Sequence, residues 1–138
     1  MASWSEAEDI PETETFRRLR APQVVSLWLG NFSSEDELLD YLEENFTNDF
    51  GFEIYEPAGP EQDVSSTGPK LIYDLLDGFS QYKNFRDDAV KLAKSKGWEK
   101  ATTAVVFYAF KYDPSLIKRK KGFPLTFIGT VPNIELKK

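Results

Sequence analysis

The sequence predicts an α+β fold, in which two helices cover a mainly antiparallel sheet. Patterns for strands and helices follow one another along the chain in the order β, α, short β, α, β, β. This order lacks the regular βαβα alternation that is typical of a parallel sheet. A chain of 138 residues with 41% hydrophobic and 14% aromatic residues is long and apolar enough to fold around one core. We therefore predict a single domain.

The N-terminal part of the chain has no clear hydrophobic period. Residues 1–23 mix acidic residues and prolines with Arg17, Arg18 and Arg20. We interpret them as an N-terminal arm and assign residues 24–138 to the domain. The first residues also lack the basic and apolar regions of a signal peptide, and no segment is apolar enough to span a bilayer. The sequence thus predicts a cytoplasmic protein with no membrane contact.

The domain is predicted to begin with a strand and a helix. The apolar run Val24–Leu29 is typical of a buried strand and ends at a Gly-Asn turn. Ser34, with Glu37 three residues later, has the pattern of a capping box and predicts the start of a helix. On a helical wheel the apolar residues of this helix fall within an arc of about 100°, as expected for a face that packs on the core. They are Leu38, Leu39, Leu42 and Phe46.

The middle of the chain predicts a second helix. Phe52–Tyr55 fits a short strand, Glu56–Pro69 a long loop, and Lys70–Gly78 a helical turn. The second helix is predicted to be capped by Ser80 and stopped by Gly97. Its core face would hold Tyr82, Phe85, Ala89, Leu92 and Ala93.

Two strands are predicted near the C-terminus. Thr102–Tyr112 alternates large apolar residues on both faces and is the strongest strand pattern in the chain. Pro124–Val131 is interpreted as its hairpin partner, with a basic loop between the two strands.

The composition argues against an enzyme. The chain contains no cysteine and no histidine, which excludes disulfides, cysteine nucleophiles and the usual catalytic triads. No nucleotide-binding or metal-binding motif is present, so no cofactor and no metal are predicted. Two carboxylate pairs stay open on paper as a glycosidase or hard-cation site. They are Asp49 with Glu53, and Asp74 with Asp77.

The charges of the chain divide it into an acidic and a basic half. Residues 1–64 hold 16 Asp and Glu against 3 Arg, a net charge of −13, whereas residues 65–138 hold 7 against 14 Lys and Arg, a net charge of +7. The two halves sum to the net charge of −6. Such a separation of charge bears on partners and association rates rather than on the fold.

The first helix concentrates this negative charge on the side opposite its apolar face. Solvated helices usually intersperse lysine with glutamate, because like charges at i and i+4 repel, yet no basic residue follows here. A plain solubilising surface is one interpretation, and capture of a basic partner by electrostatic steering is the other. In the second case Tyr41 and Tyr55 are candidate aromatic anchors. The candidate steering residues are Asp36, Glu37, Asp40, Glu43 and Glu44.

The basic loop offers an alternative function. Lys118, Arg119, Lys120 and Lys121 are able to contact phosphates, so a nucleic-acid or phosphate-binding accessory protein is the second hypothesis. Repulsion from the acidic half makes nucleic acid the less favoured partner.

Four segments of the chain resemble the immunity protein 22 family of bacterial polymorphic toxin systems. The similarity is carried by Val25–Leu42, with its strand, Trp-Leu-Gly turn and acidic helix, and by Asn48–Glu56, with an Asp-Phe-Gly segment. It continues more weakly through Leu75–Phe85 and Val106–Tyr112. The resemblance implies a cytoplasmic antidote that binds and neutralises a cognate toxin domain, often a nuclease. A toxin with a basic surface would then be the partner of the acidic helix.

Overall fold

The computed structural model describes residues 12–118 and 124–134 and confirms the predicted α+β class. Its helices, including the 3-10 turns η2 and η3, and its strands follow in chain order. They are α1 (Glu14–Leu19), β1 (Arg20–Gly30), α2 (Glu35–Glu44), α3 (Phe46–Phe50), η2 (Glu56–Ala58), β2 (Glu61–Val64), β3 (Lys70–Leu71), α4 (Ile72–Leu75), α5 (Tyr82–Ser95), β4 (Lys100–Ala101), β5 (Thr103–Phe110), η3 (Pro114–Leu116) and β6 (Leu125–Pro132). Within the described ranges no helix is long and apolar enough to cross a membrane.

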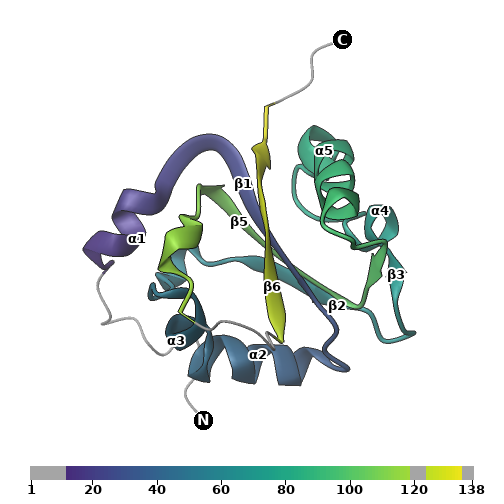
Figure 1. Ribbon diagram of the computed structural model, residues 1–138, viewed down its shortest axis with the longest axis horizontal. Helices are drawn as coiled ribbons and strands as arrows, with labels where there is room; N and C mark the ends of the chain where they lie inside the picture. Colours follow the sequence, from purple (N-terminus) through teal and green to yellow (C-terminus); the bar gives the residue numbers. More distant parts are fainter. Residues whose placement is uncertain (1–11, 119–123, 135–138) are drawn as a thin grey trace.

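The main sheet is antiparallel and has the strand order β2-β5-β1-β6 (Figure 1). A second, two-stranded sheet pairs β3 with β4. The strand β1 lies in the centre and pairs with both β5 and β6. Its apolar run is therefore buried on both faces, and Trp28 is fully buried, as its place in a predicted strand indicates.

Alternating side chains of the central strands divide the core into two clusters. Trp28 and Phe107 face α1, α2 and α3, whereas Leu27 and Val106 face α4 and α5. The period of two along a strand sends successive side chains to opposite faces of the sheet. The helices therefore form two groups on opposite sides of the sheet, as Figure 1 shows.

The predicted hairpin between the last two long strands is wrong. β6 lies at the other side of β1 and does not pair with β5. β5 pairs with β1 along one edge, from Val25–Tyr108 to Gly30–Thr103, and with β2 along the other, so neither of its edges is left for β6. Burying both edges of β1 satisfies its backbone groups and removes them from water.

The prediction for residues 52–69 is also corrected. Phe52–Tyr55 forms no strand, although Phe52 and Ile54 are buried in the core. The predicted loop Glu56–Pro69 instead contains β2, which pairs with β5 at the edge of the main sheet. None of the four residues of β2 is buried, so its polar sequence Glu-Gln-Asp-Val has no apolar alternation that would have predicted a strand.

The start of α5 and the N-terminal stretch differ in detail from the prediction. α5 begins after Gln81, a positive-φ residue without a side-chain cap, and Ser80 does not cap it. Gly97, at φ +87°, ends the helix as predicted. Of the stretch interpreted as an arm, residues 12–23 hold α1 and the start of β1, and Phe16 is buried in the core.

Candidate functional site

Two sets of hydrogen bonds fix the N-terminus of the helix α2, one accepted by Ser34 and one accepted by Glu37. The Ser34 hydroxyl oxygen accepts from the backbone N–H of Glu37 at 3.2 Å, which confirms the predicted cap. The Glu37 carboxylate accepts in return from the backbone N–H and the hydroxyl of Ser33, one residue before the expected partner. These bonds from Ser33 hold the pKa of Glu37 below its ordinary value and keep its carboxylate charged.

The inner side of α2 is anchored to the core. Leu38, Tyr41 and Leu42 are buried in the cluster that contains Trp28. Tyr41 is only 5% exposed, and its hydroxyl donates to the buried carboxylate of Asp49 in α3. This residue, predicted as a contact anchor, thus has a place inside the fold, where it joins α2 to α3.

The exposed surface of α2 carries carboxylates. All five predicted steering residues are exposed, and Glu35 joins them. We call these six residues the acidic face: Glu35, Asp36, Glu37, Asp40, Glu43 and Glu44. In the part of the chain that the structure describes, every ion pair involves other acids, so no cation neutralises this face.

The part of the acidic face beyond the first turn works against the stability of its own helix. Asp36 and Asp40, and likewise Asp40 and Glu44, are like charges four residues apart. Glu43 and Glu44 lie in the last turn, which contains no basic residue, where the helix dipole favours cations. The arrangement is therefore one that fold stability alone does not favour.

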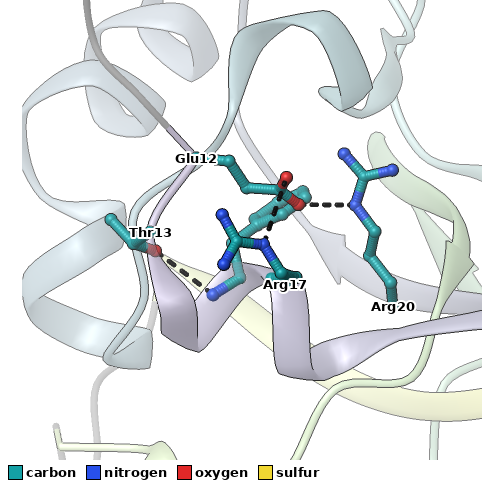
Figure 2. Close-up of polar contacts among 5 residues, drawn as sticks. Glu12, Thr13, Arg17 and Arg20 are labelled. Carbon is teal, nitrogen blue, oxygen red and sulfur yellow. Dashed lines mark hydrogen bonds and ion pairs between the residues drawn. The ribbon is translucent and has the colours of Figure 1, made fainter.

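The arginines nearest to α2 in the sequence are held by other groups. Figure 2 shows Arg17 and Arg20 directed toward Glu12, with distances of 3.8 and 2.6 Å between their Nε atoms and its carboxylate oxygens. Arg18 pairs with Glu14 within α1. These three cations thus compensate the acids of their own segment and leave the acidic face uncompensated.

Tyr55, the other predicted aromatic anchor, is half-buried beside α1. Its ring meets the ring of Phe16 edge-on, with centroids 6.1 Å apart, and the Arg20 guanidinium carbon lies 5.7 Å from its centroid. These contacts place Tyr55 with the arginines rather than with the carboxylates of α2.

A shallow groove adjoins the N-terminal end of the acidic face. It has a volume of about 320 Å³ and is lined by Asn31, Phe32, Ser33, Glu37 and Pro124. Phe32 is half-buried and packs against Tyr41, with ring centroids 5.6 Å apart. Sequence analysis did not identify Phe32 as a contact residue. The Gly-Asn turn directly before Phe32 is the sequence signal that could have identified it, because this turn places Phe32 in the groove that Glu37 also lines.

A family model described as Immunity protein 22 matches residues 25–132. The chain belongs to the Immunity protein 22 family. The match extends from the middle of β1 to the end of β6 and includes the whole acidic face. No curated protein and no solved structure matched the chain. Membership in this family supports an immunity role, with a toxin as the partner, and families of this kind are generally non-enzymatic.

In this Immunity protein 22 chain, three carboxylates of the two pairs left open by the sequence have surroundings that the structure describes. Asp49 is buried against Tyr41, whereas Glu53 is exposed. Asp77 pairs with Arg86 at 2.9 Å. Among the described residues, no group of three or more acidic side chains is placed to hold a metal ion.

The predicted basic loop falls mostly outside the described residues. Arg119, Lys120 and Lys121 belong to that part of the chain. Lys118 is described, is exposed, and donates its backbone N–H to the carbonyl of Asp49. The nucleic-acid hypothesis for residues 118–121 therefore stays a prediction from the sequence.

Proposed function

We propose that this Immunity protein 22 member neutralises a cognate toxin domain by covering a basic surface of the toxin with the acidic face of α2. Family membership supports the immunity role. The observation that carries the choice of surface is that six exposed carboxylates lie on one helix without a cation to pair them among the described residues.

The class of toxin follows from charge complementarity. A nuclease must present Lys and Arg side chains to bind the phosphate backbone of its substrate. A rigid surface of opposite charge attracts that region over long range and raises the association rate. The protein thus inhibits by occlusion, contributes no catalysis, and acts in the cytoplasm, where the nucleic acid of the producing cell is exposed.

We assign the residues different roles within the proposed interface. Asp36, Asp40, Glu43 and Glu44 steer the toxin, since exposed rim charges mainly change association rates. Glu37 and Phe32 line the groove, where a fixed carboxylate beside an aromatic ring favours a guanidinium group. Tyr41 supports the helix from inside, and Tyr55 extends the contact only where the toxin reaches α1.

Co-expression tests the proposed function directly. The candidate toxin is the C-terminal domain encoded immediately upstream, produced with and without this protein. We expect the domain alone to kill the cells, co-expression to rescue them, and the two proteins to form a stoichiometric complex that weakens with salt. Absence of both rescue and complex would contradict the immunity proposal.

A matched pair of variants tests the acidic face. Asp40→Lys with Glu44→Lys is expected to slow association at least tenfold at low salt, because each substitution replaces attraction by repulsion. Asp87→Lys with Asp88→Lys makes the same change of charge at exposed positions of α5, on the other side of the sheet. The control pair should keep a near wild-type rate in stopped-flow measurements. Equal effects of the two pairs would mean that net charge, and not α2, controls binding.

A further inference from the structure

The helical group opposite the acidic face ends in an exposed apolar edge. Leu71 in β3 and Tyr73 in α4 are each 47% exposed, and they are two of the three large hydrophobic side chains that are exposed among the described residues. In Figure 1, β3 lies at the outer rim of the molecule below α4 and α5. We call Lys70, Leu71 and Tyr73, with Asp74, the β3 edge.

Tyr73 is held in a fixed position rather than extending freely into solvent. The Arg86 guanidinium carbon lies 3.7 Å from the centroid of its ring, and Arg86 also donates to its hydroxyl at 2.6 Å. Asp77 pairs with the same guanidinium, which also lies 4.8 Å from the ring centroid of Tyr82. An exposed aromatic ring ordered in this way loses little further entropy on binding, and Tyr and Arg are the residues most enriched in interface centres.

The backbone beside these side chains is available for pairing. The sheet that contains β3 has only two strands within the described residues, so β4 covers just one of the two edges of β3. An uncovered strand edge is a template for a further strand, and the two residues of β3 limit this template to a short pairing. An exposed apolar side chain on such an edge favours pairing with another chain.

We propose that the β3 edge is a self-association surface, in which two copies of this chain meet about a two-fold axis. The charges on the edge favour a second copy as the occupant, because Lys70 and Asp74 flank the apolar pair with opposite signs. A contact about a two-fold axis presents the same residues of each copy to the other copy. An edge that carries both a positive and a negative charge is therefore complementary to itself. The acidic faces, packed on the other side of the main sheet, stay apart in such a dimer.

The contact is expected to be weak. The β3 edge has four residues, against roughly 20–30 on each side of a standard interface, so we expect a dissociation constant on the order of 10–100 µM. Sedimentation equilibrium of the purified full chain at concentrations from about 5 to 300 µM is the appropriate measurement. The expected result is a monomer at the low end and a dimer at the high end.

Substitutions distinguish this edge from other surfaces. Tyr73→Glu and, separately, Leu71→Asp should each shift the dissociation constant upward at least tenfold, and a thermal melt of each variant establishes that it folds. Ser66→Glu adds the same charge at an exposed turn outside the edge and should leave the dimer intact. The proposal is overturned by a wild-type chain that remains monomeric up to the highest concentration, or by a dimer that survives both substitutions.

The same experiment separates this proposal from toxin binding. Self-association is measured without toxin, so its failure leaves the acidic face as the proposed toxin site, and failure of co-expression rescue leaves the dimer untouched. If amides of β3 are protected from hydrogen exchange only in the toxin complex, the edge belongs to the toxin and the dimer proposal is wrong.

Discussion

Replacing Glu44 by lysine should stabilise the fold while it weakens binding of the toxin. Glu44 is the last residue of α2, is exposed, and follows Asp40 by four residues. The substitution removes a like-charge pair and creates an Asp–Lys pair in the favourable orientation, each worth about 0.2–0.5 kcal/mol. It also exchanges an anion for a cation at the C-terminal end of the helix dipole. Removing the anion and adding the cation are each worth about 0.3–1 kcal/mol.

The expected gain is therefore about 1 kcal/mol in the free energy of unfolding at low ionic strength, taking the lower end of each range for an exposed site. Glu and Lys have similar helix propensities, so intrinsic preference adds little. For a domain of this size the gain corresponds to a rise of about 3 °C in Tm. In about 1 M salt, where the Debye length falls to about 3 Å, most of it should disappear.

Glu35→Lys is the matched control for this prediction. It makes the same change of charge on the same helix, but in the first turn, where the dipole favours an anion. We expect it to lower Tm while Glu44→Lys raises it, both measured by thermal unfolding at low and high salt. Equal shifts of the same sign would show that net charge dominates, and a lower Tm for Glu44→Lys would refute the reasoning that α2 sacrifices stability.

Three further predictions concern the anchoring of the site. Gly51→Ala should destabilise the fold by more than about 3 kcal/mol in chemical denaturation, because its φ is +81° and an added Cβ would lie 2.5 Å from a backbone carbonyl oxygen of η3. Gly78 has a φ of +96° and open space around it, so Gly78→Ala should lower the free energy of unfolding only by the cost of the left-handed backbone conformation, about 1–2 kcal/mol. Equal losses in the two variants would show that the close contact at Gly51 does not contribute. Tyr41→Phe should lower the unfolding free energy by about 1–3 kcal/mol, since a buried carboxylate of α3 loses one donor, and an unchanged midpoint would contradict this. The hydrogen bonds from Ser33 lower the pKa of Glu37, so the stability they add is present above the ordinary pKa of a glutamate and is lost as the pH falls through the lowered pKa. In Ser33→Ala, NMR titration should find the pKa of Glu37 raised. An unchanged pKa would show that the Ser33 hydroxyl does not cause the lowering.

The elements that sequence analysis predicted best are those whose side chains alone determine the structure. α2 has both a cap and an apolar stripe, and β1 and β5 have apolar runs too long for an edge strand. The pairing of β6 was beyond such reasoning, because a strand pattern identifies a strand without naming its neighbour. β2 was not predicted because none of its four residues is buried, so its sequence has no apolar period.

The candidate site shows the same division. The exposure of the five predicted carboxylates followed directly from the helical wheel, because charge and periodicity are local properties. The place of Tyr41 did not follow, since its hydroxyl has a partner in the next helix and amphipathic side chains fit either side of a helix. Phe32 was missed because the neighbours of a turn residue depend on distant parts of the chain, which a local pattern does not reveal. In this protein Pro124 is such a neighbour, and it lines the same groove.

Under the proposed function, the loss of helix stability on the acidic face is explained by a gain in the speed of encounter with the toxin. An antidote to a nuclease must reach its target before the nucleic acid is cut, so the association rate matters as much as the final affinity. Complementary charges raise this rate from about 10⁵–10⁶ to as much as 10⁸–10⁹ M⁻¹s⁻¹. The loss of about 1 kcal/mol is tolerable because Tyr41, Leu38 and Leu42 fix the helix to an aromatic core from the other side. Lysines at Asp40 and Glu44 should therefore make the protein more stable and less protective at the same time.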